Sequence, residues 1–581
     1  MGNLVEKNIP RHLKKWIVDQ NYQKYSPIDQ AVWRYVMRQN HNFLKDVAHE
    51  KFTTGLVDSG IRIESIPNVE EMNECMSPFG WGVVNIDGFI PAIAFFSFQS
   101  QGILPVASEI RSLKHILYTP APDIIHEAAG HAPILCDEKY SEFVKLFGTI
   151  GSKAIATKEE HEVFEAARAL SNMLELGSAS DEEVEAAKKT LEEKTKQVVA
   201  VSEAEQIARF YWWTVEFGMI GDVNNPRIYG AGLLSSIGES ANSLTDKVKK
   251  LPFDLETVIN TGFDITVQQP QLFVCESFEQ LIDAVHEFSE RMAYKRGGTE
   301  SLDKAIHSGS TATMVYSSGL QVSGTLTDIE KDATGEAFYL KTTGPTTLAF
   351  DHAELEGHGK DRHFHGFGSP IGKLQNEAKP IEDFSDEDLQ RHGIEIGKKT
   401  KLSFESGVQL VGETASILKR NGKIVIITFT DVTVSYGERA LFQPEWGEYD
   451  MAVGESIISV FGGAADPEKF YNSEEDVQPE LKSLPKREYS KLEALYGSVR
   501  EMREKDVFGK DEEERIQQAF HDLEQEFTND WLLRLEIYEL LQHHQSLPDI
   551  QNKLLQDLND LKGKSEEWNS LINNGLRLVA G

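Results

Sequence analysis

The stretch Pro122-Asp123-Ile124-Ile125-His126-Glu127-Ala128-Ala129-Gly130-His131-Ala132-Pro133 places two histidines and a glutamate in a largely small and apolar run. Imidazole is the commonest metal ligand at neutral pH, because it binds as the neutral base. The run therefore indicates a metal site.

The spacing of the histidines distinguishes this run from the zinc protease signature. HExxH places its histidines four residues apart on one helical face, with the glutamate as base. His126 and His131 are five apart, and five residues of an ideal helix turn the second side chain roughly 140° from the first. Both can face one ion only if the helix loosens or ends between them, for which Gly130 and Pro133 are well placed. Two ordinary histidines beside a solvated Glu127 are the alternative, since short motifs match by chance.

A third ligand is expected from the aromatic run 208–220, in which Glu216 is the only acid. A carboxylate buried among large aromatic side chains costs several kcal/mol unless a cation or metal accompanies it. Pairing of Glu216 with Arg209 or another arginine is the alternative. Two histidines and one carboxylate form the facial triad of non-haem Fe(II) oxygenases. In such a site Glu127 would not bind the iron itself but would contact one of its ligands or a cofactor.

Three elements, in the same order, resemble those of the tetrahydrobiopterin-dependent aromatic amino acid hydroxylases. The iron-binding PDxxHExxGHxP element is matched at 122–133, a YWxTVEFG element at 211–218, and a YGAGLLSSxGE element at 229–239. The resemblance extends more loosely from about Tyr25 to about Arg296. It ends in 269–278, which is similar to the family's QPxxxVxESF segment. The resemblance implies a mainly α-helical catalytic domain of this type.

The resemblance also implies the residues of the site. His126, His131 and Glu216 match the residues that hold Fe(II). Arg111 matches the arginine that grips the substrate carboxylate, for which a guanidinium fork is well shaped, and Asp123 matches the acid that orients it. The residues that match the walls of the amino acid site are Thr119, Pro133, Trp212, Ser235 and Ser236.

The pterin site is implied by the stretch 88–95, which aligns with the family's pterin loop. Phe95 matches the aromatic side chain that stacks on the flat bicycle. The other pterin-site candidates are Glu127, Phe89 and Ala92. An ordinary buried strand over 89–98 is the alternative, because the stretch is mostly apolar.

The implied activity is that of a pterin-dependent iron monooxygenase, phenylalanine 4-monooxygenase, which converts L-phenylalanine to L-tyrosine with O2 and tetrahydrobiopterin or a related tetrahydropterin. An ungapped alignment places Ile265 opposite the ring and favours phenylalanine, whereas a shift of one residue places Asp264 there. Tyrosine or tryptophan hydroxylation is the alternative within the family. Alternatives from other classes are a zinc-dependent hydrolase with Glu127 as general base and a non-catalytic amino acid sensor. Tyrosine biosynthesis and phenylalanine catabolism are both open as the context.

The composition is that of a globular protein, with 40% hydrophobic and 26% charged residues. Three cysteines in 581 residues argue against a disulfide framework and predict a cytoplasmic location. Neither a long apolar run nor a signal-like N-terminus is present, so no membrane span or secretion is expected. A net charge of −34 disfavours nucleic acid and anionic membranes as partners.

We predict a multidomain chain of three segments. Residues 1–300 are the catalytic domain, in which the Glu/Lys/Ala-rich stretch 153–201 is a helical insertion capped at Ser180 or Asp181. Short alternating apolar runs and glycines predict a β-rich domain of unknown role at 301–480. Apolar residues three and four apart predict a helical C-terminal region at 481–581, through which the chain would form any homo-oligomer.

Two details of the β-rich segment have further structural implications. The sequence similarity between 318–324 and 406–412 indicates a duplicated strand unit, with a period of about 88 residues. The histidines His358, His363 and His365 raise the question of a second metal site. No carboxylate or cysteine accompanies them at a firm spacing, so the sequence favours an ordinary exposed loop.

Overall fold

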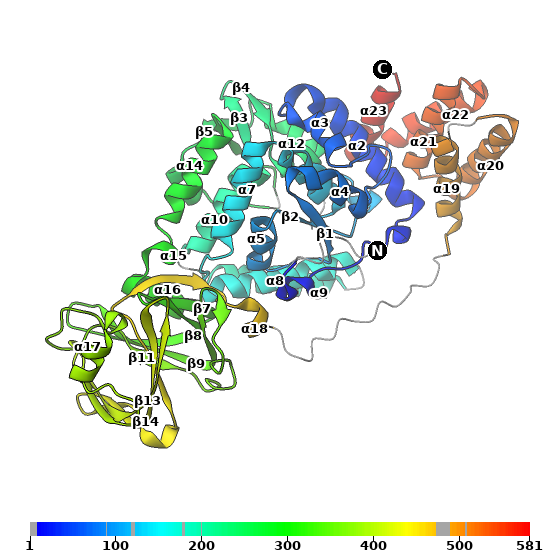
Figure 1. Cartoon of the computed structure of the whole chain (residues 1–581). Helices are drawn as coiled ribbons and strands as arrows, with labels where there is room; N and C mark the ends of the chain where they lie inside the picture. Colours follow the sequence, from blue (N-terminus) through cyan, green and yellow to red (C-terminus); the bar gives the residue numbers. More distant parts are fainter. Residues whose placement is uncertain are drawn as a thin grey trace.

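The computed structural model describes residues 9–88, 90–117, 122–176, 180–198, 200–265, 267–471, 488–505 and 508–580. A mainly helical body lies at the centre, a β-rich unit is attached at one end of it, and a C-terminal helical bundle packs on its side (Figure 1). None of the helices in these ranges combines the length and the apolar character needed to cross a bilayer.

The long helix α2 (Pro27–Val47) organises the helical body. Ser26 and Asp29 form a capping box at its start, with Pro27 in the first turn, where a missing N–H costs nothing. Its buried face belongs to the largest hydrophobic core of the protein. The other α-helices of the body are α1 (Arg11–Lys14), α3 (Lys51–Asp58), α4 (Val69–Met76), α5 (Ala92–Ser100), α6 (Ala132–Leu135), α7 (Glu138–Gly151), α10 (Glu203–Tyr211), α11 (Ala231–Ser235), α12 (Ile237–Ser243), α13 (Leu255–Asn260), α14 (Phe278–Ser289) and α15 (Ala293–Arg296).

Two small sheets complete the body. Strands β1 (Gly82–Ile86) and β2 (Ile103–Ala107) pair in parallel. The second sheet has the order β4-β3-β6-β5, from β3 (Met219–Asp222), β4 (Asn225–Ile228), β5 (Lys249–Pro252) and β6 (Gln271–Cys275). The strand alternative for 89–98 is wrong, because α5 begins directly after Pro91, whose fixed φ suits a helix start.

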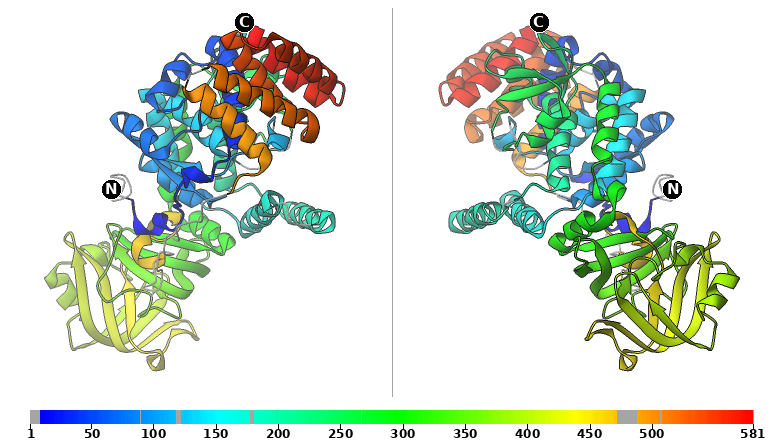
Figure 2. Two further views of the ribbon diagram at one scale, coloured as in Figure 1. Left: turned by 90° about the vertical axis from the view of Figure 1, so that its right-hand side faces the viewer. Right: turned by 90° about the vertical axis from the view of Figure 1, so that its left-hand side faces the viewer.

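A helical hairpin projects from the body, as Figure 2 shows. It consists of α8 (Lys158–Leu176) and α9 (Asp181–Thr195), within the stretch predicted as an insertion. Of the two predicted caps, Ser180 is the one observed, in a capping box with Glu183. Lys194 Nζ lies 2.6 Å from Glu162 Oε2 and links the two helices.

The β-rich unit contains two antiparallel sheets whose apolar side chains pack in two adjacent cores. The first sheet is formed by β7 (Thr311–Tyr316), β8 (Leu320–Lys331), β9 (Ala337–Phe350), β10 (Ala353–Glu354), β11 (Gly368–Pro370) and β17 (Ile457–Gly462). The second is formed by β12 (Lys399–Ser403), β13 (Val408–Arg420), β14 (Lys423–Tyr436), β15 (Arg439–Phe442) and β16 (Tyr449–Ala452). The short helices α17 (Asp386–Arg391) and α18 (Pro467–Tyr471) accompany them.

The segment predicted as β-rich begins with a helix, because residues 301–308 complete α16 (Gly298–Ser308), whose Leu302 and Ala305 pack in the first core of the β-rich unit. Leu302 and Ala305 are buried on one face of this helix, three residues apart. Gly309 ends it with a φ of 59°, and the first strand begins at Thr311.

The similar sequences 318–324 and 406–412 lie in a repeated three-stranded meander, β7-β8-β9 and β12-β13-β14. Gly319 and Gly407 occupy the same turn, with φ values of 93° and 95°. Each middle strand then bulges at its glycine, Gly324 in β8 and Gly412 in β13. The two meanders therefore share a turn and a bulge as well as a strand order.

The C-terminal helices pack on α2 and share its core. They are α19 (Lys491–Lys505), α20 (Lys510–Glu526), α21 (Trp531–His544), α22 (Pro548–Lys562) and α23 (Glu566–Ala580). Arg34 Nη2 lies 2.5 Å from Glu536 Oε2, and both side chains are almost fully buried. Tyr35 donates to the carbonyl of Leu571 at 2.7 Å, and its ring meets Trp531 edge-on. This bundle is therefore built into the body rather than tethered to it.

Candidate metal centre

A π-helical turn brings the two histidines of the run 122–133 to one face. Residues Ile125–His131 form the π-helix η4, in which i→i+5 hydrogen bonds place residues five apart nearly above one another. Gly130 is required here, since a Cβ at this position would lie 2.6 Å from the carbonyl oxygen of Ala231. The local structure is thus the loosened helix that the spacing of His126 and His131 demands.

Glu216 completes a cluster of three ligand-type side chains. It ends a second π-helical turn, η5 (Trp212–Glu216), which continues α10. Its Oε2 lies 3.2 Å from His126 Nε2, and its Oε1 lies 3.3 Å from His131 Nε2. Ligands that bind one ion at ~2.1 Å are separated by about 3 Å, so these atoms are spaced as a metal requires. The alternative partner for Glu216 is wrong, because Arg209 pairs with Glu205 at 2.8 Å.

The residues present fit a divalent metal. His131 Nε2 and Glu127 Oε2 are buried and have no hydrogen-bond partner within the described part of the chain. A buried polar atom without a partner costs about 1–3 kcal/mol, which a bound cation would offset. Burial lowers the pKa of His126, but Glu216 outweighs this and raises it to about 9. A cation held by the same atoms would take the place of that proton.

Ser235 fixes the orientation of one histidine. Its hydroxyl donates to the carbonyl of Ala231 at 2.7 Å and lies 3.0 Å from His126 Nδ1. Because the hydroxyl has a single proton, it must accept from Nδ1–H, which leaves Nε2 free to face Glu216. The next residue, Ser236, caps α12 by accepting from the Glu239 amide. The sequence placed both serines in the amino acid wall; their hydroxyls are engaged in these two structural roles.

Arg111 and Asp123 form a buried bidentate pair. Asp123 Oδ2 accepts from Arg111 Nε and Oδ1 accepts from Nη2, each at 2.8 Å. Asp123 also accepts from the Arg111 and His126 amides, at 2.9 and 3.1 Å. Burial raises the pKa of this carboxyl, but Arg111 outweighs it and holds the pKa below its usual range. Asp123 therefore connects the arginine to the metal-binding turn.

The two predicted ring-wall residues come from segments next to the candidate metal cluster. Trp212 begins η5 and stacks on Phe263 with centroids 4.4 Å apart, while Pro133 is buried in α6. Ile265, which the alignment placed against the substrate ring, is 52% exposed, so its side chain does not support that role. Asp264 is also exposed.

The pterin candidates are only partly brought together. Glu127 is buried within η4, and desolvation raises its pKa despite the two histidines beside it. Phe95 is half-buried on α5 and meets Tyr211 edge-on, whereas Ala92 is exposed at the start of the same helix. Phe89 and Thr119 lie outside the described residues.

Sequence reasoning missed Phe263 and Gln269. Gln269 is 3% exposed and accepts from the Trp212 indole at 3.4 Å. The side-chain amide of Gln269 donates to the carbonyls of Asp264 and Val267 and so fixes the chain that precedes it next to Trp212. The signal was present, because Gln269 opens the family-like segment 269–278.

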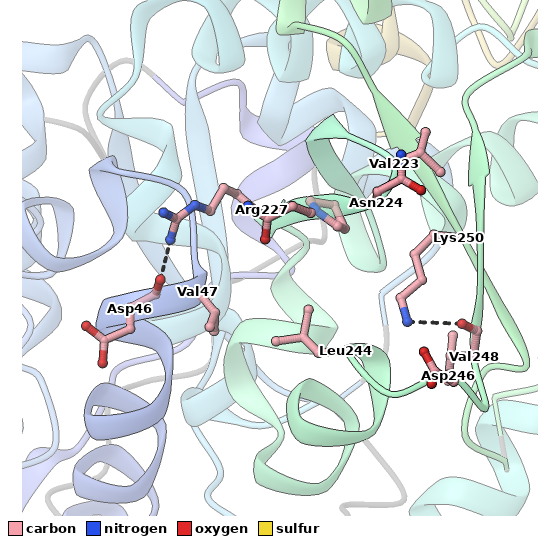
Figure 3. Close-up of a pocket in the computed structure, with 11 residues that line it drawn as sticks. Asp46, Val47, Val223, Asn224, Arg227, Leu244, Asp246, Val248 and Lys250 are labelled. Carbon is pink, nitrogen blue, oxygen red and sulfur yellow. Dashed lines mark hydrogen bonds between the residues drawn. The ribbon is translucent and has the colours of Figure 1, made fainter.

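A surface hollow lies elsewhere on the body, between α2, the β3–β4 hairpin and β5 (Figure 3). The two basic side chains that line it already make hydrogen bonds to the backbone. Arg227 donates to the Asp46 carbonyl, and Lys250 donates to the carbonyls of Thr245 and Val248. None of the described site residues lines this hollow.

Comparison with known proteins matches residues 17–186 and 197–298 to the family model described as biopterin-dependent aromatic amino acid hydroxylase. The chain is 27% identical over 292 residues to a phenylalanine-4-hydroxylase of Mesorhizobium japonicum, covering 50% of this chain and 90% of that one. It is 29% identical over 267 residues to the phenylalanine-4-hydroxylase of Chromobacterium violaceum, covering 46% and 75%. A crystal structure of the latter enzyme with bound iron(III) and oxidised 7,8-dihydrobiopterin has 27% identity, a TM-score of 0.37, and coverage of 47% of this chain and 85% of that one.

Proposed function

Because the N-terminal half of this chain resembles the biopterin-dependent aromatic amino acid hydroxylase family, we propose that it is a phenylalanine 4-monooxygenase. It converts L-phenylalanine to L-tyrosine with O2 and tetrahydrobiopterin, or a related tetrahydropterin, at a non-haem Fe(II). The observation that carries the proposal is the convergence of His126, His131 and Glu216 from two π-helical turns. Two histidines and one carboxylate leave coordination positions open, as an oxygenase requires.

The triad side chains hold the metal, and Ser235 keeps one of them in place. Iron and the reduced pterin supply the electrons that activate O2. The Ser235 hydroxyl fixes the His126 ring with Nε2 toward Glu216, so that this nitrogen would be presented to a metal held there. Burial of His131 keeps bulk water away from its own Nε2.

Arg111 binds the substrate carboxylate in this proposal. A guanidinium group matches a carboxylate through two parallel hydrogen bonds, and Asp123 holds Arg111 in a fixed orientation. Trp212 and Pro133 contact the substrate ring, with Thr119, Ser235 and Ser236 in the surrounding wall. The Phe263 stack keeps the indole of Trp212 from rotating.

The pterin binds beside Phe95 and Glu127, with Phe89 and Ala92 as further contacts. The Phe95 ring offers a face for stacking on the bicycle. Glu127 offers a buried carboxyl oxygen without a hydrogen-bond partner among the described residues, which is the contact that a polar atom of the cofactor would make.

The proposal is tested by offering phenylalanine, tyrosine and tryptophan separately to the Fe(II)-loaded protein, with tetrahydropterin and O2. Chromatography identifies the products, and His126→Ala is the control. Tyrosine formed from phenylalanine and lost in the control supports the proposal. Hydroxylation of tyrosine or tryptophan alone assigns a different ring specificity. Turnover without O2 and pterin indicates a hydrolase, and phenylalanine binding without any product indicates a sensor.

Homo-oligomer formation through the C-terminal region and a cytoplasmic location stay predictions. The face of the bundle that packs on α2 is already buried within one chain, so an oligomer would use its outer helices.

A further inference from the structure

The long loop between β10 and β11 brings two histidines to a distant aspartate. His358 and His363 lie in this loop, and Asp450 lies on β16 of the second sheet. His358 Nδ1 and His363 Nε2 each lie 3.7 Å from Asp450 Oδ2. The three ligand-type atoms lie within 4.8 Å of one another. Long-range folding thus supplies the carboxylate that the local sequence lacks.

Both histidine nitrogens that face Asp450 lack a hydrogen-bond partner among the described residues. His363 is only 8% exposed, so water does not readily satisfy its Nε2. Burial lowers the pKa of His363 to about 4, despite the nearby aspartate, which leaves a neutral ring at pH 7. Two neutral imidazoles that aim unpartnered nitrogens at one carboxylate oxygen are arranged as ligands rather than as an ion pair.

Neighbouring groups hold Asp450 in a way that leaves one of its carboxylate oxygens able to bind an ion. Its Oδ1 accepts from Thr428 Oγ1 at 2.7 Å and from Arg362 Nη2 at 3.0 Å, and its Oδ2 accepts from Arg362 Nε at 2.6 Å. A carboxylate oxygen has two lone-pair directions, so Oδ2 can serve Arg362 on one side and an ion on the other. Carboxylate ligands in metal sites are usually fixed by such outer hydrogen bonds.

The local charge also favours a cation. Arg362 is shared between Asp450 and Glu448, whose Oε2 lies 2.9 Å from its Nη2. One guanidinium therefore balances two carboxylates, and the cluster carries a net negative charge before any ion binds.

We propose that His358, His363 and Asp450 form a second metal site, which takes a divalent transition-metal ion such as Zn²⁺. Tetrahedral ligands at ~2.1 Å are separated by about 3.4 Å, and the two histidine–aspartate distances of 3.7 Å are close to this spacing. A donor set of two imidazoles and one carboxylate, without thiolate, suits Zn²⁺ or Co²⁺. The loop follows the first meander and β16 belongs to the sheet of the second, so the ion joins the two halves of the β-rich unit.

The test uses the full chain with His126→Ala and His131→Ala, which removes the N-terminal centre. The protein is stripped with a chelator and titrated with Co²⁺ alone, then with Zn²⁺ alone. One equivalent per chain, with the visible absorption of low-symmetry Co²⁺ that Zn²⁺ displaces, is the expected result. Failure of this protein to bind one equivalent of either ion at micromolar metal overturns the proposal.

Three additional substitutions in that background locate the ion. His363→Ala and Asp450→Asn should each weaken binding at least 100-fold. His365→Ala, an exposed histidine of the same loop, is the matched control and should bind normally. Binding that persists in folded His363→Ala and Asp450→Asn proteins places the ion elsewhere and refutes the assignment. Because the readout is stoichiometry and absorption, the result is independent of hydroxylation at the N-terminal centre.

Discussion

Replacement of Asp123 by asparagine should separate the positioning of Arg111 from the metal chemistry. Asparagine keeps the shape of the side chain but removes its charge, and its amide group points an N–H at one of the guanidinium donors. The pair is bidentate with both contacts at 2.8 Å, and Arg111 is only 6% exposed. Removing one partner of such a buried pair costs about 3–5 kcal/mol. We therefore expect the free energy of unfolding to fall by roughly 3 kcal/mol.

The kinetic effect should be a higher KM for phenylalanine rather than a lower kcat, because the substrate carboxylate is bound in the ground state and the transition state alike. We expect kcat/KM to fall by about 100-fold, equivalent to ~2.7 kcal/mol. Steady-state kinetics at saturating pterin and O2 measure this change, and urea unfolding measures the stability.

The pH dependence gives an independent check. The folded-state pKa of Asp123 is depressed, so its stabilisation is present above the unfolded pKa of about 3.9 and is lost as pH falls through the folded value. The stability difference between the wild type and Asp123→Asn should therefore be full at neutral pH and shrink below about pH 4.

The matched control is Glu71→Gln, which removes an exposed pair with Arg62 and should leave both KM and stability unchanged. An Asp123→Asn protein with wild-type KM and wild-type stability would refute the reasoning. It would mean that Arg111 is held by its surroundings without the carboxylate.

Three further predictions concern other parts of the body. Burial raises the pKa of Glu239 from its ordinary 4.5 to about 7, so the wild type should lose stability as pH rises from about 4.5 to 7, whereas Glu239→Gln should not. Urea unfolding at pH 5 and pH 9 should show a relative gain for the variant of ~2 kcal/mol. Gly130→Ala drives a Cβ to within 2.6 Å of the Ala231 carbonyl and should weaken iron binding at least tenfold, as metal analysis after gel filtration would show. Arg34→Met removes the nearer arginine partner of buried Glu536 and leaves it the longer contact with Arg503 at 3.6 Å, so it should cost about 3–5 kcal/mol. A second change, Glu536→Leu, should restore part of this loss in a double-mutant cycle.

The candidate metal cluster could be predicted from sequence because the spacing of its histidines restricts the backbone. The five-residue separation of His126 and His131 required a loosened helix, and the structure contains a π-helical turn there. The role of Ser235 could not be predicted in the same way. Its contact with His126 depends on how α11 packs against η4, and the sequence separation of the two residues hides that packing.

The β-rich unit shows where local patterns fail. Strand alternation predicted the sheets, but Leu302 and Ala305 have helical spacing that a short window merges with the strands that follow. The carboxylate opposite His363 was missed because Asp450 reaches it only through the pairing of β14 with β16. Contacts that depend on strand order across many residues leave no trace in local periodicity.

The pairing of α2 with the C-terminal bundle affects how the protein folds during synthesis. Arg34 and its partner Glu536 are separated by 502 positions in the chain. At 5–20 residues per second, a ribosome needs on the order of 25–100 s to make the second after the first. During that interval the face of α2 that carries Tyr35 has emerged but has nothing to pack against. The N-terminal body can therefore reach its final packing only after the last helices leave the ribosome, and an early stop in translation would release a protein with this face exposed.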